Sequence, residues 1–315
     1  MTDIPPPPHR ILLADHFRDA LAEELARLRP DLELRARDRT TITREDLRWA
    51  DCYLGFRPPT TVEIEHVSWV HGTGAGLDAF LFRRHFPAGV LLTRTSESFG
   101  PKIGEYCVAR ALAVTQELSA FEADQRTGRW DTRDLRMLAG SRATVVGTGD
   151  VGRGVATLLG ALGVRVDGVS RSGAARAPFA ATHPVSRLGA LAPKTDWLIL
   201  AAPLTDATWH IANAALFTAC RGTYLINVGR GGLVDEAALL TALDAGAVGG
   251  AALDVFETEP LPAGSPLWKH PRVTISPHVS GLSTIANAAK GFLDALGSLE
   301  RGERPTMAVD PARGY

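Results

Sequence analysis

The sequence predicts two α/β domains, each a doubly wound parallel sheet, with a cleft between them. Two observations lead to this fold class. Short apolar runs alternate with helical patterns along most of the chain, and one glycine-rich turn lies between a predicted strand and a predicted helix. The length of 315 residues is sufficient for two domains of ordinary size.

The first third of the chain alternates strand and helix patterns. Apolar runs bounded by Gly- or Pro-rich turns predict strands, and amphipathic spacing predicts helices. The predicted strands are Ile11–Ala14, Leu32–Leu34, Cys52–Gly55, Val67–Val70 and Val90–Thr93, and the predicted helices are Phe17–Leu28 and Arg44–Trp49. This alternation, with short connections, is typical of a parallel sheet covered by helices.

The pattern restarts after a long predicted helix, Pro101–Ala123, whose proline suits a first helical turn. A predicted helix at Gly152–Leu162 and six predicted strands then form a unit of the size of a nucleotide-binding domain. The six strands are Ala143–Val146, Val164–Val169, Trp197–Ala201, Thr223–Val228, Ala251–Val255 and Val273–Ile275.

The closing segment, Ser283–Glu300, has a helical pattern and no strand after it. We expect it to pack back on the first domain, which makes that domain discontinuous. The expected boundaries are therefore residues 1–99 plus 282–315 for one domain and residues 100–281 for the other.

The composition excludes several classes of protein. Hydrophobic residues make up 45% and charged residues 22% of the chain, as in an ordinary globular protein. The net charge of −1 gives no electrostatic basis for binding nucleic acid or an anionic membrane, and no apolar run reaches the length of a membrane span. The three cysteines, at positions 52, 107 and 220, form no CxxC pair. We therefore expect a reducing compartment, by default the cytoplasm, with neither disulfides nor a metal site.

The strongest local signal is G-x-G-x-x-G at Gly147, Gly149 and Gly152, between a predicted strand and a predicted helix. The first glycine permits the tight turn, the second lets a pyrophosphate approach the backbone, and the third allows close helix–strand packing. The helix N-terminus, with Asp150 and Val151, presents free amides to the anion. The motif in this context predicts a Rossmann-type dinucleotide site, although the Asp150 charge is mildly unfavourable beside phosphates.

The end of the next predicted strand determines which dinucleotide we expect. NAD sites place a carboxylate about 20 residues further on, where it binds the ribose hydroxyls. Ser170 lies at that point, followed by Arg171 and Ser172. Hydroxyls and a guanidinium bind a 2′-phosphate, which a carboxylate would repel, so NADP is the expected cofactor. NAD stays open, because Asp167 lies nearby and Arg171 could equally be a solvated loop residue.

Charged residues lie beside three later strand ends, in Leu225–Gly231, Ala252–Pro260 and Thr274–Gly281. In a doubly wound sheet the carboxyl ends of the strands converge on the ligand crevice. We therefore expect an arginine (Arg230), a carboxylate and a histidine (His278) to meet at a nicotinamide.

With these segments the chain resembles the D-isomer-specific 2-hydroxyacid dehydrogenase family over nearly all of its length. The resemblance is carried by Gly74–Asp78, the glycine motif, Pro203–Thr205, Asn227–Asp235 and the two later segments. The Ser-Arg-Ser turn and Phe99–Tyr106 are most similar to the glyoxylate/hydroxypyruvate reductase branch. The resemblance implies a Rossmann-type cofactor domain, a flavodoxin-like substrate domain and a homodimer built around the helix that begins near Pro101. The implied reaction is hydride transfer from NAD(P)H to a small 2-keto acid, which gives a D-2-hydroxy acid.

The resemblance also implies roles for individual residues. Arg230 would clamp the carboxylate and carbonyl oxygen of the substrate, and His278 would protonate that oxygen. Glu259 would hold the imidazolium, and Asp254 would orient the nicotinamide carboxamide, with Pro203 also on the cofactor side.

Backbone amides of Ala75 and Gly76 would complete the carboxylate site. Each side chain also has a plainer interpretation: Asp254 as a turn cap, Glu259 as a solvated acid and Arg230 as a surface charge. His270 lacks the Ser-Pro-His context and is expected to be an ordinary surface histidine.

Two alternative functions are considered. Some members of the family are dinucleotide-sensing corepressors that keep the same triad. An L-lactate or malate type dehydrogenase would carry its glycine motif near the N-terminus, whereas here the motif begins at Gly147. Ser280 and Gly281 replace a common glycine pair, and Leu92–Gly100 departs from the commonest family pattern, so the identity of the 2-keto acid stays open.

Overall fold

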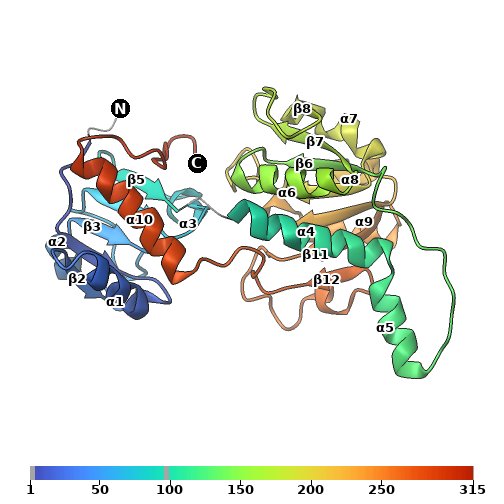
Figure 1. Cartoon of the computed structure of the whole chain (residues 1–315), viewed down its shortest axis with the longest axis horizontal. Coiled ribbons are helices and arrows are strands. Elements are labelled where there is room, and N and C mark those ends of the chain that lie inside the picture. The colour runs from blue at the N-terminus through green and yellow to red at the C-terminus, as the bar shows by residue number, and fades with distance from the viewer. Residues whose placement is uncertain (1–3, 96–98, 315) are drawn as a thin grey trace. The chain divides into compact units, whose positions relative to one another are not determined.

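The computed structural model describes residues 4–95 and 99–314 (Figure 1). Residues 96–98, part of the unusual segment Leu92–Gly100, lie outside the described residues. The chain divides into two compact units, one of Met1–Ser98 with Ser283–Tyr315 and the other of Phe99–Leu282. Each unit is an α/β fold on a parallel sheet, which confirms the predicted fold class.

The described part of the first unit contains a five-stranded parallel sheet in the order β2-β1-β3-β4-β5. The strands are β1 (Arg10–Leu13), β2 (Glu33–Ala36), β3 (Cys52–Leu54), β4 (Trp69–Gly72) and β5 (Leu91–Arg94). This is the order of flavodoxin-like sheets, in which the direction of winding reverses between the first and third strands. Ligands of such sheets bind outside the carboxyl ends of the strands at that point.

Helices cover both faces of this sheet. They are α1 (Arg18–Leu28), α2 (Arg44–Trp49), α3 (Asp78–Leu81) and α10 (Ile285–Glu300). The closing helix α10 packs beside α1 and buries Phe292 and Leu296 against Leu21 and Leu25. The Phe292 ring stacks on Trp69 of β4, with ring centroids 5.1 Å apart.

The described part of the second unit contains a seven-stranded parallel sheet in the order β12-β11-β10-β9-β6-β7-β8. The strands are β6 (Arg142–Val146), β7 (Arg165–Ser170), β8 (Ala181–Pro184), β9 (Trp197–Leu200), β10 (Thr223–Asn227), β11 (Val248–Leu253) and β12 (Val273–Ile275). All six predicted strands are present, but the described sheet contains a seventh strand, so the predicted number was wrong. The missed strand, β8, is a half-buried edge strand of sequence ATHP, so it carries neither an apolar run nor a clear alternation.

The helices of the second unit lie on both faces of its sheet. The α-helices are α4 (Phe99–Thr115), α5 (Leu118–Thr127), α6 (Asp150–Ala161), α7 (Leu188–Leu191), α8 (Ala214–Ala219) and α9 (Glu236–Asp244). The short 3₁₀ helices are Val185–Arg187, Ala192–Lys194, Gly231–Leu233 and Pro266–Lys269. No helix in the described ranges is long and apolar enough to cross a membrane.

The single long helix predicted over Pro101–Ala123 is two helices, α4 and α5. The break lies at Glu117, whose φ of 48° is left-handed, and no Gly or Pro marks it in the sequence. The helix α5 extends from the body of the second unit, and a long connection returns from it toward β6 (Figure 1).

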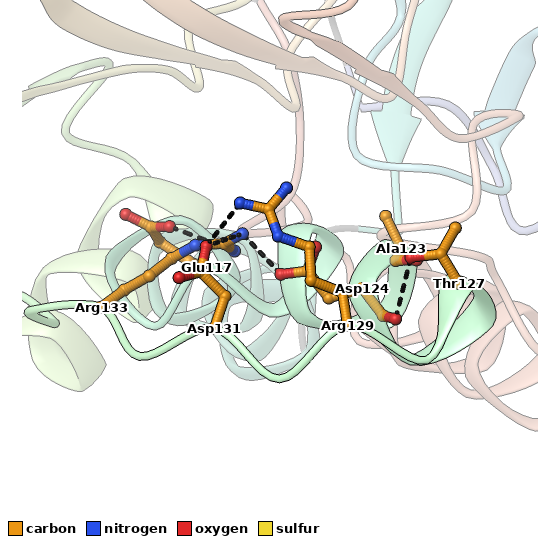
Figure 2. Close-up of polar contacts among 7 residues, drawn as sticks. All are labelled: Glu117, Ala123, Asp124, Thr127, Arg129, Asp131 and Arg133. Atoms are coloured by element: carbon orange, nitrogen blue, oxygen red, sulfur yellow. Dashed lines mark hydrogen bonds and ion pairs between the residues drawn. The ribbon is translucent and has the colours of Figure 1, made fainter.

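Ion pairs fold the start of this connection back on α5 (Figure 2). The Arg133 guanidinium donates to Asp124 at 2.5 Å and lies 3.7 Å from Glu117, while Arg129 donates to Asp131 at 2.9 Å. The network gives this projecting element a defined shape.

The helices α4 and α6 lie against each other at van der Waals distance of their backbones. A Cβ atom on Gly154 would come within 2.2 Å of the Gly100 carbonyl, and one on Gly104 would come within 2.9 Å of the Gly154 oxygen. Only glycine fits at these crossing positions, so the sequence fixes how closely α4 approaches the helix that begins at the glycine motif.

Candidate active site

The glycine motif forms a tight turn between β6 and α6. Gly147 has a φ of 106°, and a Cβ atom there would lie 2.5 Å from the Ala201 oxygen. A Cβ atom on Gly152 would lie 1.9 Å from the Gly147 oxygen, whereas one on Gly149 would meet nothing within 4 Å. The turn is therefore packed on its protein side and open at Gly149. The first amides of α6, including that of Val151, follow directly, which is the arrangement that binds a pyrophosphate.

Asp150, whose charge is unfavourable beside phosphates, has a structural partner. Its Oδ2 accepts a hydrogen bond from the Gly100 backbone N–H at 3.1 Å, near the start of α4. Arg153 lies 3.9 Å from the other carboxylate oxygen. The carboxylate thus links the glycine turn to α4 and is partly neutralised there.

The turn after β7 is organised by its own hydroxyl groups. Ser170 is the last residue of β7, and its Oγ accepts a hydrogen bond from the Gly173 N–H at 3.1 Å. Ser172 Oγ accepts one from Ala174 N–H at 3.3 Å, and Arg171 is exposed between the two serines. The turn places two hydroxyls and a guanidinium at the carboxyl end of the strand.

Asp167, the residue that kept NAD open, lies in the middle of β7 and not at its end. Its carboxylate lies 3.4 Å from Arg165 and 3.9 Å from His183, so two neighbouring side chains already face it. At the end of β9, the Pro203 carbonyl accepts a hydrogen bond from Thr208 at 2.7 Å, which closes the turn beside the glycine motif.

The Arg230 loop begins at Asn227, the last residue of β10. The Asn227 side chain accepts from Gly229 N–H at 3.2 Å and donates to the Arg230 carbonyl at 3.0 Å. A Cβ atom on Gly231 would lie 1.7 Å from the Phe256 carbonyl carbon, so the loop packs directly on the segment that leads to Glu259. Asn227 is therefore a positioning residue for the Arg230 loop, a role that was not predicted from the sequence.

His278 and Glu259 form a hydrogen-bonded pair, with Nδ1 and Oε2 2.9 Å apart. The other Glu259 oxygen, Oε1, accepts from the Phe256 N–H at 3.1 Å. Burial raises the pKa of the Glu259 carboxyl, but His278, the Phe256 N–H and the charge of Arg230 outweigh burial and place it below the ordinary value. The structure therefore brings Arg230, Glu259 and His278 together within the second unit.

Asp254 is fully buried, and its carboxylate holds the turn that carries His278. It accepts hydrogen bonds from the Ser276 hydroxyl at 2.6 Å and from the N–H groups of Val279 and Ser280 at 3.0 and 2.9 Å. These contacts of Asp254 were not predicted, since the family resemblance implies only a contact with the nicotinamide carboxamide. Ser276 lies 22 positions from Asp254, so no local sequence pattern indicated these contacts.

A second histidine–carboxylate pair, His210 with Glu257 at 2.6 Å, was also missed. The His210 backbone N–H donates to the Gly232 carbonyl at 2.8 Å, so the backbone of this residue is also bonded to the segment that follows Arg230. His270 was expected at the surface, but its side chain is only 10% exposed. It is packed beside Asp244 at 3.4 Å and accepts from the Arg272 N–H, and these contacts explain its burial.

Ala75 and Gly76 lie in the first unit, in the loop after β4. Gly74 packs under the Phe56 ring, where a Cβ atom would come within 2.6 Å. The Ala75 carbonyl accepts a hydrogen bond from Arg94 at 2.9 Å, and both Ala75 and Gly76 are half-exposed. The loop is thus fixed on two sides. None of the described residues form a cluster of histidine, cysteine or acidic groups suited to a metal ion.

Comparisons of the sequence with known proteins identify relatives that belong to one family. Residues 108–280 match the family model described as "D-isomer specific 2-hydroxyacid dehydrogenase, NAD binding domain". The chain is 33% identical over 281 residues to glyoxylate/hydroxypyruvate reductase A of Yersinia enterocolitica, covering 86% of this chain and 90% of that protein.

Solved structures agree with this match. A D-isomer-specific 2-hydroxyacid dehydrogenase of Xanthobacter autotrophicus, in complex with NADPH and MES, superimposes with a TM-score of 0.88 at 31% identity, covering 98% of this chain and 100% of that chain. An NADPH-dependent glyoxylate/hydroxypyruvate reductase of Sinorhizobium meliloti, in complex with NADP and sulfate, gives a TM-score of 0.82 at 27% identity, covering 97% and 99%. The chain belongs to the D-isomer-specific 2-hydroxyacid dehydrogenase family.

Proposed function

We propose that the protein is an NADPH-dependent reductase that converts a small 2-keto acid of the glyoxylate or hydroxypyruvate type into the D-2-hydroxy acid. The observation that carries the proposal is the hydrogen-bonded His278–Glu259 pair beside Arg230, at strand ends of the dinucleotide-binding unit. The names of the curated relatives support it, and none of these findings favours the corepressor alternative.

The residues of the second unit fit a dinucleotide. The turn at Gly147–Gly152 leaves open space at Gly149 and presents the N-terminus of a helix of 12 residues. Ser170, Arg171 and Ser172 would hold the 2′-phosphate of NADPH, and the complexes of the Xanthobacter and Sinorhizobium relatives support this choice. When bound, NADPH supplies the hydride. Val151, Pro203 and the backbone around Asp150 would contact the rest of the dinucleotide.

The triad of Arg230, Glu259 and His278 would bind the substrate and supply the proton. Glu259 occupies Nδ1 of His278, which leaves Nε2 as the nitrogen that donates a proton to the substrate oxygen. Glu259 stays negatively charged at neutral pH because its pKa lies below the ordinary value, so it stabilises the protonated ring. Arg230 would bind the substrate carboxylate and carbonyl oxygen with its planar fork. For the amides of Ala75 and Gly76, the role of carboxylate ligands stays a prediction from the family resemblance.

A substrate panel tests the function. We expect purified protein to oxidise NADPH with glyoxylate or hydroxypyruvate and to yield the D-product where the product is chiral. Phenylpyruvate tests for a bulkier side chain, and NADH in place of NADPH tests the cofactor. Absence of turnover with every 2-keto acid and either cofactor would contradict the proposed function.

We also propose that the protein acts in the cytoplasm as a homodimer, associated through the projecting segment 117–137. The segment contains large exposed apolar side chains, namely Leu118, Trp130, Leu135 and Met137, of which Trp130 is 96% exposed. The ion pairs of Figure 2 give the segment a fixed shape, which lowers the entropic cost of association. An isologous contact is the usual arrangement of a homodimer.

Sedimentation velocity tests the dimer. The wild type should sediment as a dimer at micromolar concentration, and Trp130→Ala should shift it toward monomer. Trp268→Ala is the matched control, because Trp268 is also exposed, at 51%, but lies outside the segment. A monomeric wild type, or an equal effect of both substitutions, would contradict this interface.

A further inference from the structure

We propose that Tyr106, on helix α4, is a positioning residue for His278 that acts through Ser276 and Asp254. The inference rests on the proposed function and adds a residue to it. The Tyr106 hydroxyl lies 2.7 Å from Ser276 Oγ, and Ser276 Oγ lies 2.6 Å from Asp254 Oδ1. The three groups form a continuous chain between a helix and the turn of the proton donor.

The chemistry of the three groups fixes the direction of the hydrogen bonds. An ionised carboxylate only accepts, so the single hydroxyl proton of Ser276 is donated to Asp254. Ser276 Oγ must then accept from the Tyr106 hydroxyl. Donation from Tyr106 polarises the Ser276 hydroxyl and strengthens its bond to the carboxylate. The chain therefore runs from Tyr106 to Ser276 to Asp254.

Asp254 in turn determines the backbone of the His278 turn. Three successive N–H groups point at this one residue: His278 donates to its backbone carbonyl at 2.8 Å, and Val279 and Ser280 donate to its two carboxylate oxygens. His278 has a φ of 54°, a left-handed conformation that a non-glycine residue adopts at a cost. A displaced Asp254 carboxylate would release this turn and change where the imidazole points.

The same helix that carries Tyr106 also contacts the glycine turn. Near its start the Gly100 N–H binds Asp150, and one turn later Gly104 packs on α6 at Gly154. Helix α4 also contacts the segment after His278, since a Cβ atom on Gly281 would come within 2.7 Å of the Ile103 side chain. Helix α4 thus links the dinucleotide turn and the proton donor, and the Tyr106 hydroxyl is its polar contact with the donor's turn.

The test removes single hydroxyls and measures kinetics with NADPH. Tyr106→Phe and Ser276→Ala should each lower kcat roughly three- to tenfold, which corresponds to the loss of about one ordinary hydrogen bond, while the Kd for NADPH stays unchanged. Ser276→Thr keeps the hydroxyl and should retain most of kcat. Tyr224→Phe is the matched control, because Tyr224 is a half-buried tyrosine of the same unit that is not part of the Tyr106–Ser276–Asp254 chain of hydrogen bonds, and it should leave kcat unchanged.

Amide hydrogen exchange gives a readout that needs no turnover. The Val279 and Ser280 amides should exchange faster in Tyr106→Phe than in wild type or Tyr224→Phe. Unchanged exchange together with unchanged kcat in Tyr106→Phe would overturn the positioning role, as would a loss of kcat accompanied by an equal loss of NADPH affinity. Failure of the wild type to reduce any 2-keto acid is a separate outcome, which contradicts the proposed function. In that case the amide exchange rates alone decide whether Tyr106 positions the His278 turn.

Discussion

The Nδ1 atom of His278 and the Oε2 atom of Glu259 lie 2.9 Å apart, although 19 residues separate them in the sequence. The hydrogen bond assigns the two ring nitrogens different functions, since Nδ1 is held by the carboxylate and Nε2 is left for the substrate. It also lowers the pKa of Glu259 despite the burial of that carboxyl. Both consequences can be measured.

Glu259→Gln should change the pH dependence of stability and should lower activity. An acid with a lowered pKa in the fold contributes stability that is present above its ordinary value of 4.5 and is lost as the pH falls through the lowered value. The stability difference between wild type and Glu259→Gln, measured by thermal unfolding, should therefore shrink below about pH 4.5. The imidazolium of His278 also loses its negatively charged hydrogen-bond partner, so keto acid reduction at neutral pH should be slower in the variant. Parallel profiles would contradict this coupling.

His71 predicts a second pH dependence, in the first unit. The ring is fully buried between the hydroxyls of Thr93 and Thr95, at 2.7 and 3.0 Å, and burial lowers its pKa from 6.5 to about 3. The unfolded chain binds a proton that the fold does not, so this contribution is complete above pH 6.5 and is lost as the pH falls toward 3.

The variant His71→Gln isolates that contribution. It should be less stable than wild type at pH 7, with a difference that narrows by at most about 1.4 kcal/mol per pH unit below pH 6.5. Urea unfolding at several pH values measures the difference. A difference that stays constant between pH 6.5 and 4 would show that His71 is not held neutral.

Two glycines of α6 offer a matched pair. Gly154→Ala should destabilise the protein by about 1–3 kcal/mol, because its Cβ would lie 2.2 Å from the backbone of α4. Gly160→Ala, on the same helix, meets nothing within 4 Å and should stabilise it by about 0.5–1 kcal/mol. Chemical denaturation checks both, and equal effects would argue against the close packing of α4 on α6.

Most of the fold could be predicted from local pattern, because buried parallel strands are continuous apolar runs and the glycine motif has one structural context. The edge strand β8 is polar, and the break at Glu117 has no sequence signal, so both were missed. In the site, the positions of charged residues after predicted strand ends led to the expectation that an arginine, a carboxylate and a histidine meet. The contact between Tyr106 and Ser276 joins residues 170 positions apart, and no local pattern encodes a pairing of that kind.

Cofactor preference tests the turn after β7. A charge-assisted bond from Arg171 to a 2′-phosphate is worth about 1.5–3 kcal/mol, so kcat/KM should favour NADPH roughly ten- to a hundredfold. The double substitution of Ser170 by Asp and Arg171 by Ala should reverse the preference, since it adds a repelling carboxylate and removes the cation. If the wild type favours NADH and the double change has little effect, Asp167 and not the Ser-Arg-Ser turn sets the cofactor.

The most direct test of the proposed reaction is the kcat of His278→Ala with NADPH and a 2-keto acid, together with NADPH affinity measured by fluorescence titration. General acid catalysis is worth about 10²–10⁴-fold, so kcat should fall by at least that order while the Kd for NADPH stays within a few-fold of wild type. His270→Ala is the control, because His270 pairs with Asp244 outside the site and should leave kcat unchanged. A kcat for His278→Ala equal to that of the wild type would contradict the assignment of His278 as the proton donor.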